Sequence, residues 1–267
     1  MKKVRTAREK GEMVKDVRLV LICAGGLMRG AYCAGFVNAL YDEGFNDIFH
    51  SAIGISAGAP TIAYYLAGEQ RIGSTIYFEE CTTPAFLSFV RLRNMLSIKY
   101  LSETFQGYTG KALSTQKVID SPVNFVTIVT SDKGEALYVK PTDHQEVHEA
   151  IAGSCALPLI CNEQHILNGK RVYDGGVADS MPYDYVKKEI DPTHVLIIAN
   201  RPAKIGKISR FARRTHARLA MRLLRRNQRQ LTKDPANLSI NKFYQNIHRF
   251  LDDPEIKTAV AWSPKKP

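Results

Sequence analysis

Two apolar runs early in the chain are each followed by a turn of small residues and then by a helical pattern. Residues 17–23 form an almost continuous run of β-forming side chains, which is typical of a buried parallel strand. A turn at 24–30 follows, and apolar residues recur at helical spacing over 31–42. The second unit has an apolar run at 48–53 and a helical run at 59–67. Two such units in succession predict an α/β fold with a mostly parallel central sheet flanked by helices.

Shorter elements continue this pattern along the chain. The runs at 123–130 and 135–140 are separated by a Ser-Asp-Lys-Gly turn and predict a hairpin. A helix is expected over 144–153, and strands are expected over 171–173 and 194–200.

The apolar stretch at 84–100 interrupts the alternation of strands and helices. Its side chains could form a lid or the wall of an acyl pocket. Apolar stripes at helical spacing usually belong to the core, however, and we favour a core helix here.

Positive charge is concentrated in one segment of the chain. The 267 residues carry a formal net charge of +11, and residues 201–230 contain eleven Lys or Arg and no acid. The remaining residues are therefore balanced in charge. We divide the chain into a domain at 17–200 and a basic, mostly helical C-terminal extension at 201–267.

Within this extension, residues 208–231 predict a basic amphipathic helix, and 241–251 predict a second amphipathic helix that returns to the domain. A basic amphipathic helix can lie on an anionic membrane surface, which is the partner that we favour for 208–231. Docking on the domain through its apolar side comes second. Binding to nucleic acid is least favoured, because no aromatic interleaving supports it.

Cysteine usage and the N-terminal residues indicate a cytoplasmic protein. The five cysteines are odd in number and show no C-x-x-C spacing, so we expect reduced thiols and no metal site. Residues 1–15 are charged and lack the apolar core of a signal peptide. No stretch approaches the roughly 20 apolar residues that a membrane span needs, so any membrane association would be peripheral, at the inner face.

The turn between the second strand and its helix carries a G-x-S-x-G motif, with Gly54, Ser56 and Gly58. A serine in such a strand-to-helix turn is lifted clear of the backbone at a helix N-terminus, which makes Ser56 a candidate nucleophile. The alternative is that small residues simply pack a tight joint between the strand and the helix.

The turn after the first strand is also rich in small residues, and it has two interpretations. Exposed amides at a helix N-terminus could cradle a phosphate, but the sequence lacks a P-loop and Leu27 breaks the G-x-G-x-x-G pattern. The same amides could form an oxyanion hole, which a serine nucleophile one unit downstream favours. The residues of this turn are Gly25, Gly26, Leu27, Met28, Arg29 and Gly30.

A third motif, Asp174-Gly175-Gly176, follows the predicted strand at 171–173. Asp-Gly-Gly by itself is a common turn. Together with the two earlier motifs, in this order, it resembles the patatin-like phospholipase family. The resemblance covers roughly 17–200, and it includes an A-x-S-x-x-x-P stretch with Ser154 and Pro158 and a final D-G-G-V-A-D-S-M-P segment typical of the bacterial branch.

The resemblance implies a Ser-Asp dyad with no catalytic histidine, no cofactor and no metal. Ser56 would be the nucleophile and Asp174 the general base, with the amides of Gly25, Gly26 and Leu27 as the oxyanion hole. The implied reaction is hydrolysis of carboxylic esters of lipids through an acyl-enzyme.

One position departs from the family pattern, because Leu27 replaces the third glycine of the usual G-G-G-x-[RK]-G loop. If that position requires a positive φ, a leucine costs about 1 kcal/mol or more there. A catalytically weak or silent lipid-binding protein is therefore the alternative function. Arg29 could contact an oxyanion or a headgroup, or fix the loop through a salt bridge.

A Ser-acid-His triad is the alternative to the dyad. Outside the basic segment, His194 and His248 follow Asp174 in the chain, but neither lies in a motif. We expect His165, between Asn162 and Asn168, in a surface loop.

Overall fold

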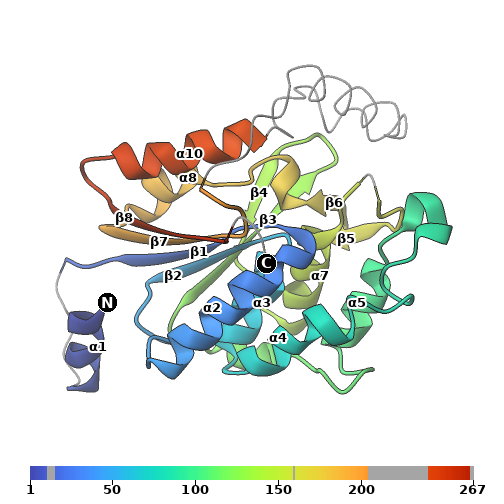
Figure 1. Ribbon diagram of the computed structural model, residues 1–267, viewed down its shortest axis with the longest axis horizontal. Coiled ribbons are helices and arrows are strands. Elements are labelled where there is room, and N and C mark those ends of the chain that lie inside the picture. Colours follow the sequence, from blue (N-terminus) through green and yellow to red (C-terminus); the bar gives the residue numbers. More distant parts are fainter. Residues whose placement is uncertain (11–15, 159, 204–239, 265–267) are drawn as a thin grey trace.

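The computed structural model describes residues 1–10, 16–158, 160–203 and 240–264. One central sheet lies between two layers of helices (Figure 1). Its strand order is β5-β6-β3-β2-β1-β7-β8, with β4 paired to β3 outside that path. This arrangement confirms the predicted α/β fold with a central sheet flanked by helices.

The sheet has a parallel part and an antiparallel part. Neighbours along β3-β2-β1-β7-β8 pair in parallel, whereas β4, β5 and β6 pair antiparallel. The strands are β1 (Leu19–Cys23), β2 (Ser51–Ile55), β3 (Asn124–Ser131), β4 (Ala136–Val139), β5 (His165–Leu167), β6 (Lys170–Asp174), β7 (His194–Ala199) and β8 (Lys257–Trp262).

Helices cover both faces of this sheet (Figure 1). The α-helices are α1 (Lys2–Glu9), α2 (Gly30–Asp42), α3 (Gly58–Leu66), α4 (Gln70–Glu79), α5 (Ile98–Phe105), α6 (Thr115–Ile119), α7 (His144–Cys155), α8 (Tyr183–Tyr185) and α10 (Ile240–Asp252). Shorter helical turns are η1 (Leu27–Arg29), η2 (Phe89–Asn94), η3 (Gly175–Val177) and the π-helical η4 (Val186–Ile190).

The alternation of side chains along β1 divides the core into two parts. Leu21 and Cys23 pack with the layer that includes α2 and α3, whereas Val20 and Ile22 pack with the layer that includes α10. Every residue of β1 is buried, because successive side chains of a strand point to opposite faces and both faces are covered.

Residues 240–262 contribute a helix and a strand to this sheet and core, although they were expected in a C-terminal extension. The predicted helix at 241–251 is present as α10, and it buries Phe243, Ile247 and Phe250 against the sheet. Strand β8, which was not predicted, pairs in parallel with β7. The basic helix predicted at 208–231 lies outside the described residues.

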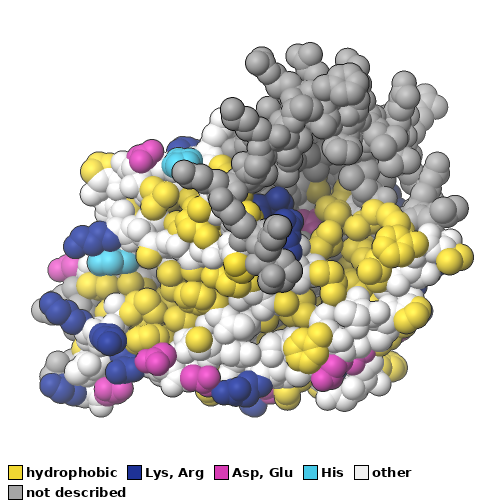
Figure 2. Space-filling view, in the orientation of Figure 1, with side chains coloured by type: hydrophobic (Ala, Val, Ile, Leu, Met, Phe, Trp, Pro, Cys, Tyr) yellow, Lys and Arg dark blue, Asp and Glu magenta, His cyan; other side chains and the backbone are white. Residues whose placement is uncertain are grey.

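The stretch at 84–100 is not the continuous core helix that we favoured. It contains the short η2 and a bridge between Leu87 and Leu96, so the chain makes a narrow excursion and returns. Arg91 donates hydrogen bonds to the carbonyl oxygens of residues 85 and 86, and these bonds fix the excursion. Phe89 and Val90 are 75% and 90% exposed at its tip, and Figure 2 shows hydrophobic side chains at the surface on this side of the molecule.

Candidate active site

Ser56 occupies a sharp turn between β2 and α3. Its φ is +53°, in the left-handed region that side chains rarely adopt, and only 7% of the residue is exposed. A Cβ atom on Gly58 would lie 2.1 Å from the carbonyl oxygen of Cys23, and one on Gly54 would lie 2.5 Å from the Cα of Ala59. The small residues therefore do pack a tight joint, and the same joint presents Ser56.

The register of β3 brings Ser56 and Asp174 together. Parallel pairing of β2 with β3 ends at Ile55 opposite Ile128, and Asp174 of β6 lies opposite Val129, the next residue of β3. Ser56 directly follows Ile55 in the chain. Residues from two distant motifs thus meet at one point of the sheet.

Asp174 is buried, and its pKa is raised to about 6 because burial disfavours the charged carboxylate. The nearby Ser56 hydroxyl and a hydrogen bond of 2.7 Å from the Gly176 amide offset part of this effect. A carboxylate with a pKa near neutrality, close to a serine hydroxyl, is suited to accept the proton of that hydroxyl.

Ser154 on α7 supports the turn at Ser56 through two hydrogen bonds. The Ser56 amide donates to the Ser154 hydroxyl at 3.0 Å, and that hydroxyl donates to the Ile128 carbonyl at 2.7 Å. From the motif alone, Ser154 was only part of the family's A-x-S stretch. Its contact with the Ser56 turn depends on the packing of α7 against β3, which the sequence does not display.

The turn after β1 lies against Ser56. A Cβ atom on Gly25 would be 3.0 Å from the Cβ of Ser56, so the backbone approaches the serine as closely as a glycine permits. Among the described residues, no acceptor receives the amide hydrogens of Gly25, Gly26 or Leu27. Free amides beside a nucleophile are the donors that an oxyanion hole requires.

Leu27 has a φ of +52° and is 43% exposed. The condition stated for this position is met, so the leucine adopts a strained conformation. The side chains of Leu27 and Met28 both line the cavity described below.

Asn200, which the sequence analysis did not single out, fixes this turn to the neighbouring strand. Its amide donates to the Ala24 carbonyl at 2.7 Å and accepts from the Cys33 amide at 3.1 Å. Arg29 donates to the Gly26 carbonyl at 3.4 Å and forms no ion pair with a described carboxylate. The loop-fixing salt bridge suggested for Arg29 is therefore not seen in the described part of the chain.

An apolar cavity of about 160 Å³ opens beside Ser56. Its walls come from α3, α4, α5 and the excursion at 84–100, and they include Tyr77, Phe86, Ile98 and Phe105. The pocket-wall interpretation of 84–100 is the one that agrees with the structure. A cavity of this chemistry can accept the hydrocarbon part of a substrate.

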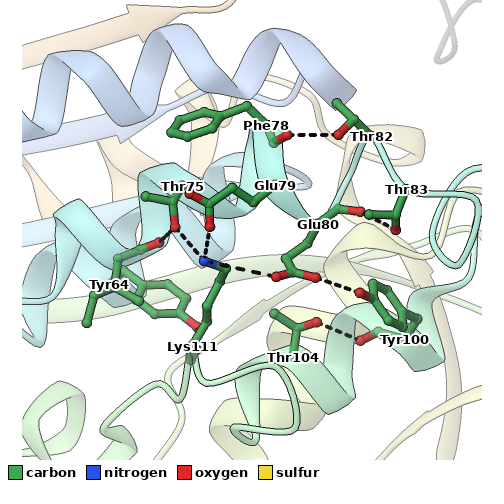
Figure 3. A network of polar contacts seen from close by, with 11 residues as sticks. Tyr64, Thr75, Phe78, Glu79, Glu80, Thr82, Thr83, Tyr100, Thr104 and Lys111 are labelled. Carbon is green, nitrogen blue, oxygen red and sulfur yellow. Dashed lines mark hydrogen bonds and ion pairs between the residues drawn. The ribbon is translucent and has the colours of Figure 1, made fainter.

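A polar network joins the helices that contribute the walls of this cavity (Figure 3). Lys111 contacts Glu79 and Glu80 at the end of α4, and Glu80 accepts a hydrogen bond of 2.5 Å from Tyr100 of α5. The Tyr64 hydroxyl donates to the Lys111 carbonyl. These contacts join α3, α4 and α5, so the wall does not depend on apolar packing alone.

The structure gives no support to a histidine triad. His194 begins β7 opposite Leu19, at the amino edge of the parallel strands, whereas Ser56 lies at their carboxyl edge. About five residues of strand, roughly 16 Å, separate those edges. His248 is exposed on α10.

His165 is not in a surface loop but in β5, and its side chain lies 3.6 Å from Glu163. Together with Cys161 these residues form the one group in the described chain whose donor atoms could surround a metal ion. Glu163 already accepts hydrogen bonds from the Ser97 hydroxyl and the Lys99 amide. The group therefore has a structural role, which is to attach the segment before β5 to the start of α5.

The turn that carries Ser56 has the sharp strand-to-helix geometry of a nucleophile elbow. The sequence profile of the patatin-like phospholipase family matches residues 21–187, which is more than half of the chain. The protein belongs to the patatin-like phospholipase family. The general class that this family defines is that of lipid acyl hydrolases.

Two individual proteins are also similar to this chain. The uncharacterised protein YjjU of Escherichia coli K12 is 26% identical over 185 residues, which cover 67% of this chain and 51% of YjjU. The chain thus spans about half the length of that curated relative. VipD from Legionella pneumophila aligns with a TM-score of 0.42 and 13% identity, over 76% of this chain and 53% of VipD.

Helices in the described ranges are all too short or too polar to cross a lipid bilayer.

Proposed function

We propose that this protein hydrolyses carboxylic esters of lipids with a Ser56-Asp174 dyad. The observation that carries the proposal is the place of Ser56 beside a buried carboxylate of raised pKa, at the opening of an apolar cavity. The serine is the nucleophile, the aspartate is the general base, and the cavity holds the acyl chain.

The reaction follows from these positions. Asp174 accepts the hydroxyl proton while Ser56 attacks the ester carbonyl, and the free amides of Gly25 and Gly26 stabilise the oxyanion. Asp174 then returns the proton to the departing alcohol, which leaves an acyl-enzyme. A water molecule, activated by the same carboxylate, attacks the acyl group and regenerates the serine.

A peripheral position at the inner face of the membrane completes the proposal. The apolar cavity requires a substrate that partitions into lipid, and the basic segment at 208–231 would supply the attraction to an anionic surface. Deletion of 208–231 should weaken binding to anionic vesicles. Unchanged binding would remove this part of the proposal.

A lipid-binding protein with weak or no catalysis is the second candidate, and the left-handed Leu27 favours it. Its side chain lines the cavity beside the proposed oxyanion hole, so it could narrow the space for a tetrahedral intermediate. Both candidate functions involve binding of a lipid. They differ in whether Ser56 reacts with that lipid.

Labelling of the purified protein with a fluorophosphonate tests the proposal directly. We expect labelling that disappears in Ser56→Ala and falls at least a hundredfold in Asp174→Asn, together with hydrolysis of p-nitrophenyl esters that follows the same order. Ser121→Ala, in the segment before β3, is the control and should label normally. A folded wild-type protein that does not label would support the silent lipid-binding protein.

A further inference from the structure

Tyr77 of α4 lies between the apolar cavity and the turn that carries Ser56. Only 8% of the residue is exposed, and it lines the cavity. Its hydroxyl donates a hydrogen bond of 2.6 Å to the carbonyl oxygen of Ala57, the residue that directly follows the serine. A side chain of the cavity wall is therefore bonded to the backbone of the Ser56 turn.

Thr61 of α3 takes part in the same contact. Its hydroxyl lies 2.8 Å from the Tyr77 hydroxyl, and it donates to the Ala57 carbonyl at 3.0 Å. The Ala57 carbonyl thus has two possible donors, and it keeps one of them if the other is removed. Loss of the Tyr77 hydroxyl alone therefore does not leave a buried acceptor without a partner, which would be strongly destabilising.

The phenol of Tyr77 also contacts the turn after β1. A Cβ atom on Gly30, the last residue of that turn, would lie 2.5 Å from the Tyr77 hydroxyl oxygen and 2.6 and 2.7 Å from two of its ring carbons. The end of the phenol therefore fills the space that a side chain at position 30 would occupy. The turn after β1 thus meets the Ser56 turn directly at Gly25, and it meets that turn through Tyr77 at Gly30.

The Tyr77 hydroxyl stays protonated near neutral pH. Burial raises the pKa of this phenol well above its ordinary value, because the charged form is poorly solvated there. The hydrogen bonds described for the hydroxyl join it to Ala57 and Thr61. Tyr77 therefore acts on Ser56 through the backbone and not as an acid or a base.

We propose that Tyr77 is a positioning residue that sets the spacing between the Ser56 turn and the turn after β1. The oxyanion of an ester attacked by Ser56 would lie between these turns, and its donors must lie within about 3 Å of it. A displacement of about 1 Å can reduce the rate about a hundredfold. The ring belongs to the cavity wall, whereas the hydroxyl sets the spacing. This inference rests on the proposed function, because it assigns Tyr77 a part in that reaction.

Tyr77→Phe tests this role, since it keeps the ring and removes only the hydroxyl. We expect kcat for p-nitrophenyl butyrate to fall at least about tenfold, with KM within about twofold of wild type because the cavity wall is retained. The rate of fluorophosphonate labelling should fall by a similar factor. The pH profile of kcat/KM should keep its midpoint at about 6, because the environment of Asp174 is unchanged.

Tyr65→Phe is the matched control. Tyr65 of α3 is also buried, and its hydroxyl donates a hydrogen bond of the same length, 2.6 Å, to the Phe45 carbonyl. Tyr65 is not among the residues that line the cavity. We expect Tyr77→Phe to lose no more stability than Tyr65→Phe in urea denaturation, and only Tyr77→Phe to lose kcat.

Each outcome supports or overturns the role of Tyr77. Unchanged kcat in a folded Tyr77→Phe protein, beside a wild type that reacts, overturns this role and leaves the proposed function intact. A loss of kcat that Tyr65→Phe shares overturns it as well, because it would reflect a general loss of stability. A rise in KM alone would confine Tyr77 to the cavity wall. A folded wild-type protein that neither labels nor hydrolyses the ester would reject the proposed function, and this role with it.

Discussion

Two turns at the carboxyl edge of the sheet hold a non-glycine residue in the same left-handed conformation. Ser56 has a φ of +53° and Leu27 a φ of +52°. Each conformation costs about 1–2 kcal/mol relative to an ordinary backbone. The two residues differ in their surroundings, because Ser56 is 7% exposed and Leu27 is 43% exposed.

The contacts around Ser56 impose its strained conformation, whereas Leu27 has fewer such contacts. Ser56 is enclosed by close backbone packing at Gly58, by the hydroxyl of Ser154 and by the carboxylate of Asp174. Leu27 follows Gly26, which supplies no side-chain cap, and its own side chain reaches into the cavity and solvent. Backbone strain persists where neighbours impose it. The serine turn is therefore imposed by its neighbours, whereas the leucine turn has fewer constraints.

The largest effect is expected at the packing that encloses Ser56. Gly58→Ala would place a Cβ atom 2.1 Å from the Cys23 carbonyl oxygen, so β1 or α3 must move. We expect a loss of at least about 3 kcal/mol in the free energy of unfolding, measured by urea denaturation. Gly35→Ala on α2 is the control, because nothing lies within 4 Å of its added Cβ, and it should be neutral or stabilising. Similar losses for both variants would contradict this account.

The next largest effect is expected at Asp174, where a substitution should raise the free energy of unfolding instead of lowering it. Its folded-state pKa of about 6 exceeds the ordinary 3.8, so the unfolded chain ionises first and stability falls as pH rises through this window. Two pKa units correspond to about 3 kcal/mol. We expect Asp174→Asn to be more stable than wild type by up to that amount at pH 7.5, and by nearly nothing at pH 3.5.

Hydrolytic activity should rise with pH over the same range in which stability falls. Because the base must be ionised, kcat/KM of the wild-type protein should rise about tenfold per pH unit below pH 6 and level off above it. Stability curves of wild type and Asp174→Asn that run parallel from pH 3.5 to 7.5 would be inconsistent with a raised pKa.

Ser154→Ala should cost about 1–3 kcal/mol in the free energy of unfolding. It removes the acceptor of the Ser56 amide and the donor to the Ile128 carbonyl, and both groups are buried. The rate of fluorophosphonate labelling should fall with it, since the turn loses its support. A loss below about 0.5 kcal/mol would mean that close packing alone sustains the turn.

The smallest effect is expected at Leu27. Leu27→Gly removes the left-handed strain and should raise the free energy of unfolding by up to about 1 kcal/mol. Met28→Gly is the control, because Met28 has no positive φ and the substitution should destabilise the protein. A loss of stability at Leu27 would show that contacts of its side chain outweigh the strain, and that this turn resembles the serine turn after all.

Much of the fold was predictable, because it depends on local periodicity. The strands and helices around Ser56 and Gly30 follow apolar runs and small-residue turns that the sequence displays directly. Strand β8 was not predicted, since it lies at the edge of the sheet and its side chains are only partly covered. An edge strand lacks the continuous apolar run that marks a strand buried on both faces.

The motifs also selected Ser56, Asp174 and the turn at 25–30 as candidates, but not the residues that contact them. Asn200 and Ser154 act through the register between strands and through helix packing, which bring together positions more than 95 residues apart. The tip at residues 89–90 escaped prediction for a related reason. Its apolar character is the same in a core helix and in an exposed excursion, and only the surrounding fold distinguishes the two.

The position of β1 in the sheet has a consequence for synthesis of the protein on the ribosome. Strand β1 pairs with β2 soon after both emerge, but its other neighbour is β7, with Leu19 opposite His194. The apolar edge of β1 therefore stays uncovered until most of the domain has been translated. Such an edge can pair with other nascent chains, so this protein should be sensitive to slowed elongation and to loss of chaperones that shield unpaired strands.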